Sequence, residues 1–408
     1  MYADGSSYHC HDRGYFYLVN KRMKRGKRMT YFDHAATTPI HPQVVETMTK
    51  LMPEIFGNPS SVHRYGRAAN EKLTTARQVI AESLAVKPHE IIFNGGGTEG
   101  DNTALISTAF ARKNQGRHII TTQIEHPAIL QTAAFLEQQG FEVTYLSVDE
   151  SGMISLDEFK VALREDTILV SIMFANNETG NLLPIKEIGA ILKDHPAYFH
   201  TDAVQAYGKV SIRPHELGID MLSISAHKIN GPKGTGFFFK RDGLSLPSFL
   251  HGGEQEEKRR AGTENLISIC GMAAAVALHS EKKQAVQAQK YQCFTDTVTR
   301  ILAEQEIAYH LNGNEQAKMP HILNIALPNI DNQMILMHMD LAGFAISTGS
   351  ACTAGNVEPS HVLTAMYGED SPYIRESIRI SFGLGNTQEE VETFAYKLSA
   401  TVKRLQKK

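Results

Sequence analysis

The sequence has few cysteines, little net charge and no long apolar run, and each shortage excludes a class of protein. Its four cysteines, Cys10, Cys270, Cys293 and Cys352, lie far apart and form no CxxC pair, which argues against a disulfide framework and a thiolate metal site. A net charge of -3 gives no basis for direct nucleic-acid binding. No apolar run approaches the roughly 20 residues that a membrane helix needs. We expect a soluble, cytoplasmic protein with no metal site and no membrane partner.

Residues 1–28 differ from the rest of the chain. Six lysines and arginines lie between positions 21 and 28, and no apolar segment of signal-peptide length follows them. The cluster His9-Cys10-His11-Asp12 offers metal-binding side chains, but no further ligands follow at a suitable spacing. We therefore expect residues 1–28 to form a basic, disordered extension.

At 408 residues the chain is too long for one ordinary core. Between residues 85 and 240, short β-rich runs alternate with helical stretches, a pattern typical of βαβ units and a mainly parallel sheet. A long helical region, 266–305, is followed by shorter strands and a C-terminal helix. The pattern predicts an α/β protein, with a large domain at 29–264 built on a helix-covered, mainly parallel sheet and a smaller α+β domain at 265–408. The N-terminal segment of the large domain is a candidate to pack on the small one.

Polar motifs follow several of the expected strands. The strands are predicted at 91–93, 118–122, 142–146, 168–174, 198–201, 221–225 and 237–239 in the large domain, and at 321–326, 345–348 and 378–382 in the small one. Ligands on a parallel sheet bind beyond the carboxyl ends of its strands. Gly95-Gly96-Gly97-Thr98, Asn176-Asn177-Glu178, Asp202 and Lys228 follow four different strands, so we expect one site to gather them.

Lys228 lies just past an apolar strand, between a histidine and a Gly/Pro turn. A solvated surface lysine is the ordinary interpretation, but burial at a strand end would lower its pKa and free the amine as a Schiff-base nucleophile. Ser225 and His227 flank it as phosphate donors. Lys233 is the local competitor, yet it lies in a Pro-Lys-Gly turn where solvent exposure is more natural.

Three further elements suit pyridoxal phosphate (PLP). Asp202 could be a helix N-cap or a surface carboxylate, but it is also the kind of acidic partner that a pyridinium nitrogen requires, and Gln205 lies about one helical turn later. His126, between a strand and a helix, is placed to stack on a flat ligand, although a structural histidine is the ordinary interpretation. The GGGT turn favours a phosphate, or simply a turn with Thr98 as N-cap; it lacks the P-loop ending and the dinucleotide spacing.

Cys352 lies in a run of small residues, 347–355, which predicts an exposed loop rather than a packed helix. An exposed cysteine in a cytosolic loop suits a reactive role. Cys270 and Cys293, by contrast, are expected to be buried small hydrophobic residues.

From Tyr31 to its end, the chain resembles the cysteine desulfurases of the NifS/IscS type, in the class V aminotransferase superfamily of fold-type I PLP enzymes. The quoted motifs carry this resemblance together with Asp33-His34-Ala35-Ala36-Thr37, Glu125-His126, Ser225-Ala226-His227-Lys228, Arg260-Ala261-Gly262-Thr263, Gly349-Ser350-Ala351-Cys352 and Arg379-Ile380-Ser381-Phe382-Gly383. Gly100 and Ala226 depart from the residues that are frequent in relatives, and neither departure removes a functional group.

The resemblance implies a residue set for PLP. Lys228 would join the cofactor as a Schiff base, Asp202 would pair with its ring nitrogen, Gln205 would bond its hydroxyl and His126 would stack on its ring. Its phosphate would be held by Gly97, Thr98, Ser225 and His227, with Thr263 from the second subunit of a homodimer. Asn177 would contact cofactor and substrate, and Arg379 would receive the substrate carboxylate, for which its planar fork is suited.

The resemblance further implies conversion of L-cysteine to L-alanine. Lys228 would remove the Cα proton and Cys352 would capture the sulfur as a persulfide, with His126 handling a proton. A sulfur-acceptor protein, an iron-sulfur scaffold or a tRNA thiolase, would then take the sulfur. A selenocysteine lyase or another class V aminotransferase-like enzyme would share everything except the Cys352 loop, and a non-catalytic protein of this fold would have lost Lys228 or Asp202.

Overall fold

The computed structural model of the protein describes residues 29–349 and 359–407. The predicted N-terminal extension and the 350–358 segment, which includes Cys352, lie outside the described residues, as does residue 408.

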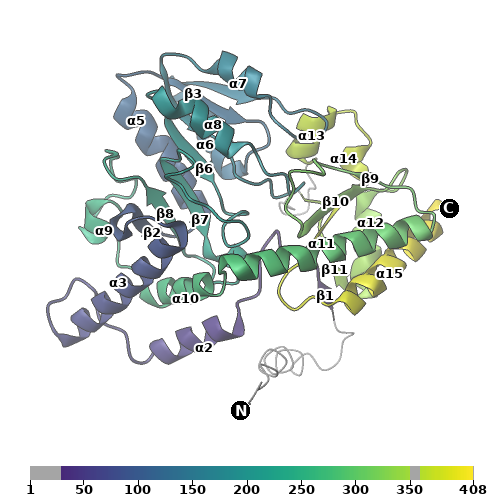
Figure 1. Cartoon of the computed structure of the whole chain (residues 1–408), viewed down its shortest axis with the longest axis horizontal. Helices are drawn as coiled ribbons and strands as arrows, with labels where there is room; N and C mark the ends of the chain where they lie inside the picture. The colour runs from purple at the N-terminus through teal and green to yellow at the C-terminus, as the bar shows by residue number, and fades with distance from the viewer. Residues whose placement is uncertain (1–28, 350–358, 408) are drawn as a thin grey trace, which may run out of the picture.

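A seven-stranded sheet forms the centre of the larger unit (Figure 1). In spatial order its strands are β2 (Ile91–Asn94), β8 (Gly236–Lys240), β7 (Met221–Ser225), β6 (Tyr198–Asp202), β5 (Thr167–Ser171), β3 (His118–Thr122) and β4 (Glu142–Leu146). β8 is antiparallel to both neighbours and all other pairs are parallel. The predicted α/β class with a mainly parallel sheet is confirmed, although the predicted strand 168–174 ends earlier, at Ser171.

Helices cover both faces of this sheet, because its strands are apolar on both sides. Phe237 and Phe239 belong to one core cluster and Phe238 to the other, as the alternation of side chains along a strand requires. The first face is covered by α2 (Pro42–Leu51), α3 (Arg64–Leu84), α7 (Leu156–Ala162), α8 (Ile185–Ile191) and α10 (Leu266–Ala277); the second by α4 (Gly97–Asn102), the π-helical turn η2 (Thr103–Ser107), α5 (Thr108–Arg112) and α6 (Pro127–Gln138).

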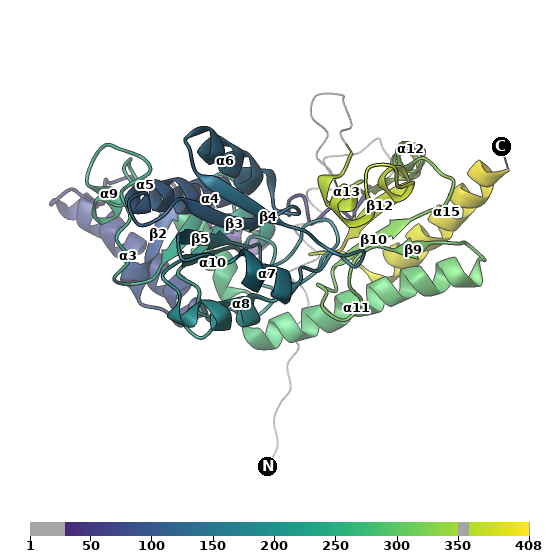
Figure 2. The same ribbon diagram turned by 90° about the horizontal axis from the view of Figure 1, so that it is seen from above.

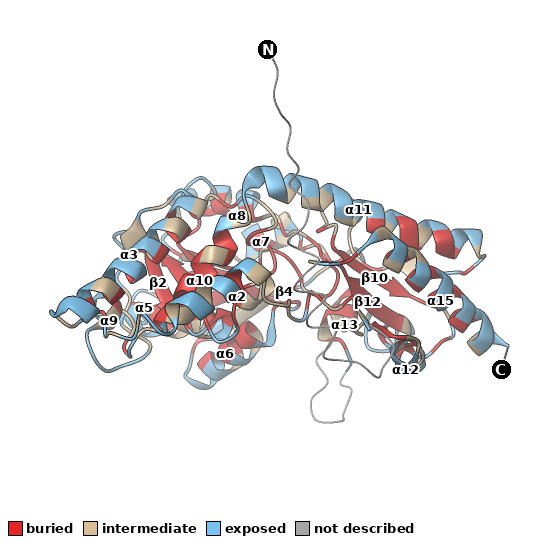
Figure 3. Ribbon diagram, turned by 90° about the horizontal axis from the view of Figure 1, so that it is seen from below, coloured by how far each residue is buried: buried red, intermediate tan, exposed pale blue. Residues whose placement is uncertain are grey.

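The smaller unit is an antiparallel sheet packed against helices (Figure 2). Its sheet has the order β12 (Ser377–Ser381), β10 (Ile322–Ala326), β9 (His310–Leu311), and its helices are α11 (Glu281–Glu304), α12 (Asn332–Ala342), α13 (His361–Tyr367), α14 (Tyr373–Glu376) and α15 (Gln388–Gln406). The buried residues of α11 recur at helical spacing, at positions 294, 297, 298, 301 and 302. Figure 3 shows the result, with α11 and α15 exposed on their outer faces over a buried sheet.

Two segments pack against elements that are distant from them in the sequence. β1 (Thr30–Tyr31) pairs with β11 (Phe344–Ala345), so the first described residues lie on the smaller unit. Helix α10, which follows residue 264, packs instead against α2 and α3 of the larger unit. We propose that the smaller domain begins with α11, whereas the sequence pattern alone placed its start at residue 265.

No helix within residues 29–349 and 359–407 is both long and apolar enough to cross a membrane. Cys270 is buried, as expected, but Cys293 is exposed on α11, and the expectation that it is buried is wrong. Helical periodicity explains the difference, because position 293 precedes the buried stripe that begins at Phe294.

We predict that Phe32→Ala strongly destabilises the protein. Phe32 is fully buried and packs edge-on against Phe382 and Phe394, so the change should cost about 3–5 kcal/mol. Thermal unfolding followed by circular dichroism would measure the loss. The matched control is Phe135→Ala at a side chain that is 41% exposed, and an equal loss in both variants would contradict the assigned packing.

Candidate active site

A cavity of about 1230 Å³ lies at the carboxyl ends of the parallel strands and receives residues from both units. It is lined by most of the predicted site residues: Gly97, Thr98, His126, Asn177, Asp202, Gln205, Ser225, His227, Lys228 and Arg379. Thr263 is exposed and does not line the cavity of its own chain. Cys352 lies outside the described residues, although Gly349 lines the cavity three positions before it.

Lys228 ends the short turn η4 (Ala226–Lys228) that follows β7. Its ammonium donates to the main-chain carbonyls of Ala35 and, at 2.9 Å, Ala36. Burial and, as the second cause, the charge of Arg379 lower the pKa of Lys228 to about 8. An amine with this pKa is partly neutral near pH 8, as a nucleophile or base requires. Lys233 lines the same cavity but is exposed, as expected.

Asp202 and Gln205 lie at and just beyond the end of β6. The Asp202 carboxylate accepts the Val204 N–H at 2.9 Å and is almost fully buried. Burial raises its pKa, while His126 and Lys228 oppose the rise. Gln205 donates to the Ala35 carbonyl at 2.9 Å, and its buried Oε1 has no partner among the described residues. A carboxylate and an unused acceptor therefore face the cavity together.

His126 is the N-cap of α6, where its Nδ1 accepts the Ala128 N–H at 3.1 Å. A neutral ring with an accepting Nδ1 carries its hydrogen on Nε2. Burial lowers the pKa of His126, which favours this neutral form. The preceding Glu125 is buried and ties the turn to the end of β3 through Thr122 at 2.8 Å and to the segment after β5 through the Met173 N–H at 2.9 Å. The turn that carries the imidazole ring of His126 is therefore held in place.

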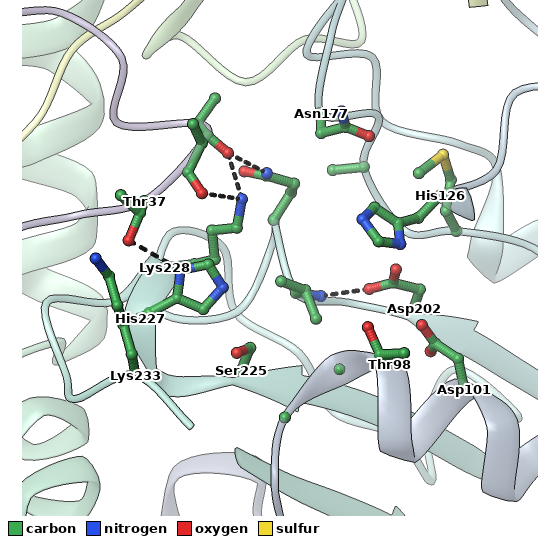
Figure 4. A pocket seen from close by; sticks show the side chains of 18 of the residues that line it. Thr37, Thr98, Asp101, His126, Asn177, Asp202, Ser225, His227, Lys228 and Lys233 are labelled. Carbon is green, nitrogen blue, oxygen red and sulfur yellow. Dashed lines mark hydrogen bonds between the residues drawn. The ribbon is translucent and has the colours of Figure 1, made fainter. Parts of the chain in front are cut away.

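One end of the cavity offers donors to an anion. Gly97 and Thr98 are the first residues of α4, where backbone N–H groups have no intrahelical acceptor. Gly96 has φ +138°, and a side chain there would approach the Ser225 hydroxyl at 3.3 Å, so only glycine allows this close approach. Arg260 neutralises Glu99 in the same turn at 2.8 Å. Figure 4 shows Thr98 and Ser225 beside this turn.

His227 completes the same end of the cavity. It shares a hydrogen bond of 3.0 Å with the Thr37 hydroxyl, and burial lowers its pKa to about 4. The ring is therefore neutral at pH 7 and can donate one N–H to a phosphate.

Arg379 enters from β12 of the smaller unit and is almost fully buried. Its Nη2 pairs with Asp33 at 2.8 Å, and its Nη1 donates to the Asn177 carbonyl at 2.8 Å. Asn177 is presented by a turn in which the Asn176 side chain accepts the Glu178 N–H at 2.8 Å. The Arg379 Nε is buried without a partner among the described residues. This unused donor points to an acidic ligand.

Two side chains that the sequence analysis did not assign also line the cavity. Asp33 pairs with Arg379. It belongs to the Asp33–Thr37 motif that carries the family resemblance, but no role was expected for its individual residues. Asp101 lies on α4, buried next to Asp202, and had no signal beyond its place in the helix. Burial and the charge of Asp202 raise the pKa of Asp101 well above its usual value.

The donor atoms of Asp101, His126 and Asp202 lie within 4.8 Å of one another (Figure 4). Such a set could hold a metal ion by its chemistry. It also matches what a PLP ring needs, a carboxylate at the ring edge with an imidazole beside it. The unused Gln205 Oε1 and the glycine-lined anion end of the same cavity favour PLP, since neither would serve a metal ion at the cluster.

Comparison with known proteins gives a consistent result. The Aminotransferase class-V profile matches residues 30–394. The chain is 51% identical to IscS 1 of Bacillus subtilis, named as a candidate cysteine desulfurase, over 92% of this chain and 99% of that protein. It is 44% identical to the cysteine desulfurase IscS of Dictyoglomus turgidum, over 90% of this chain and 92% of that protein.

Solved structures agree with these sequence relatives. A NifS-like protein superposes with a TM-score of 0.86 at 34% identity, covering 92% of this chain and all (100%) of that one. SspA in complex with cysteine superposes with a TM-score of 0.76 at 35% identity, covering 86% of this chain and 98% of that one.

We predict that Lys228 in the cofactor-free chain is acetylated by acetic anhydride at pH 8 far faster than exposed lysines. With its pKa of about 8, its neutral fraction is about 100-fold larger than that of an ordinary lysine at this pH. Peptide mass spectrometry would follow Lys228 against the exposed Lys193. The rate should fall steeply below pH 7, because the amine is then protonated. Equal rates for both lysines at pH 8 would show that the amine is not perturbed.

Proposed function

Because the chain belongs to the class V aminotransferase family, with cysteine desulfurases of the IscS type as its relatives, we propose that it is a PLP-dependent cysteine desulfurase that converts L-cysteine to L-alanine. Lys228 carries the proposal: a lysine with a pKa of about 8, in a cavity whose other polar groups match one cofactor. We place the enzyme in the reducing cytoplasm, where a reactive Cys352 stays reduced.

The residues of the cavity would hold PLP in a defined orientation. Gly97, Thr98, Ser225 and His227 would bind its phosphate, and Asp202 would pair with its ring nitrogen, with Gln205 Oε1 accepting the ring hydroxyl. His126 would lie against its ring. Bound PLP supplies an electron sink for the Cα–H bond of an amino acid joined to it. The protein supplies the remaining groups, which are the base, the carboxylate receptor and the sulfur acceptor.

Substrate orientation would depend on Arg379 and Asn177. Arg379 lines the cavity, so its guanidinium could receive a carboxylate beside the existing contact with Asp33. The Lys228 amine, once free, would take the Cα proton, for which it must be neutral, and burial keeps it partly so. The neutral His126 can donate from Nε2 to a leaving or entering sulfur.

Cys352 is the proposed sulfur acceptor. Gly349 lines the cavity, and three residues of chain reach at most about 10 Å. Both flanks of the 350–358 segment meet Glu178: Ser360 donates to its carboxylate at 2.5 Å, and a side chain at Gly349 would lie 2.8 Å from the same oxygen. With both flanks held there, the Cys352 thiolate would attack the substrate sulfur as the C–S bond breaks, leaving a persulfide and the alanine skeleton.

A homodimer would complete the site. Thr263 is exposed, which leaves it available to the phosphate of a second subunit's cofactor. Large apolar side chains are also exposed on the same unit, among them Phe56 at 70%, Val62 at 89% and Tyr65 at 58%, and a second copy would remove them from water. The persulfide would pass to a sulfur-acceptor protein, an iron-sulfur scaffold or a tRNA thiolase.

We predict that Cys352→Ser abolishes release of sulfide from L-cysteine while the protein keeps a PLP absorbance band at roughly 400 nm. Serine cannot form a persulfide, whereas cofactor binding does not require Cys352. The matched control is Cys293→Ser, at the exposed cysteine of the described residues, which should keep full activity. Full activity of Cys352→Ser would contradict the persulfide mechanism. Absence of the absorbance band in the wild type would contradict the PLP assignment.

We predict that Arg379→Lys raises KM for L-cysteine by about tenfold or more, because lysine loses the planar fork and a charge-assisted hydrogen bond. Cysteamine, which lacks the carboxylate, provides the comparison substrate. Its turnover should change much less than that of L-cysteine. Equal losses with both substrates would mean that Arg379 does not receive the carboxylate.

A further inference from the structure

Lys209 is a lysine that the proposed mechanism does not use. It follows the turn after β6, and burial lowers its pKa to about 7, with the charge of Lys228 as the second cause. Among the described residues no carboxylate pairs with it; its amine contacts two carbonyls. Removing a lysine from water without a counterion costs free energy. The hydrogen bonds of this amine must offset part of that cost.

The two carbonyls belong to residues that carry the site. The Lys209 ammonium donates to the Gln205 carbonyl at 2.9 Å and to the Lys228 carbonyl at 3.4 Å. Within the described residues neither carbonyl accepts a backbone N–H outside the helices and strands. Lys209 is therefore the donor that satisfies both.

The segments that it bridges are in close contact. A side chain at Gly208 would lie 2.8 Å from the Ile229 methyl group, so the turn after β6 rests directly on the turn that follows β7. Gly208 has φ +76°, which favours glycine. The Gln205 side chain and the Lys228 amine also share the Ala35 carbonyl as acceptor. A shift between the two turns would separate these groups.

We propose that Lys209 is a positioning residue for Lys228: its amine bridges the carbonyls of Gln205 and Lys228 and so keeps both side chains directed into the cavity. This inference rests on the proposed function for its role in cofactor binding. Its effect on Lys228 itself does not require the cofactor, because the contacts are present in the chain alone.

The charged and titratable groups around the two amines belong to several elements. The charges of Arg379, Asp202 and Asp33 shift the pKa of Lys228. The charge of Lys209 lowers the pKa of four histidines, namely His34, His227, His279 and His321. The low pKa of Lys228 arises mainly from burial. Loosening the turn would therefore return its amine to water and raise its pKa.

The test compares Lys209→Met, which keeps the aliphatic stem and removes both donations, with Lys209→Arg, which can still donate. In the cofactor-free Lys209→Met protein, the pH of half-maximal Lys228 acetylation should rise by about one unit or more, because burial is relieved. The PLP dissociation constant should rise about tenfold, and the circular dichroism of bound PLP should change because the ring is held differently. In Lys209→Arg, the acetylation pH, the PLP dissociation constant and the dichroism of bound PLP should stay close to their wild-type values. The exposed Lys193→Met is the matched control and should change none of them.

A purely structural lysine would give a different result. If Lys209→Met lowers only the melting temperature, with acetylation pH, PLP affinity and dichroism unchanged, the inference is overturned. If Lys209→Met does not fold, Lys209→Gln, which keeps a neutral donor, should show smaller shifts in the same directions, and unchanged values would overturn the inference. Failure of the wild type to bind PLP would remove the proposed function, while the acetylation result in the cofactor-free chain would still decide whether Lys209 positions Lys228.

Discussion

The burial of the Lys228 amine is the constraint on which the rest of the site depends. A lysine leaves water only at a cost, and here that cost keeps the amine partly neutral near pH 8. The carbonyls of Ala35 and Ala36 stabilise it without neutralising it. Those carbonyls come from the segment that follows β1, which pairs with the smaller unit. The reactivity of one side chain therefore depends on how the two units meet.

Arg379 shows the same dependence from the other side of the cavity. Its guanidinium lies on β12, pairs with Asp33 beyond β1 and reaches the Asn177 carbonyl of the larger unit. Because the pair is almost fully buried on the arginine side, loss of either partner would leave an unpaired charge in the cavity. The contact therefore joins the units and at the same time shapes the place where a substrate carboxylate would bind.

Much of the site could be predicted from local pattern. Strands 118–122, 142–146 and 221–225 were predicted to the residue, because each is a short run with apolar or β-branched residues that is bounded by turn residues. The carboxyl ends of parallel strands meet at one edge, which is why Asp202, His126 and Lys228 could be expected to converge. Cys293 was not predictable in this way, because one step around a helix decides whether a side chain is buried.

The sequence by itself determined the class of fold, the positions of most strands along the chain and the residues that suit PLP, since these follow from periodicity, turn chemistry and residue type over short stretches. The tertiary structure decided which distant groups meet: Asp33 with Arg379, Asp101 beside Asp202, α10 against α3, and Lys209 beneath Lys228. Periodicity acts over a few residues, whereas burial and pairing depend on distances between segments that lie as much as 355 positions apart.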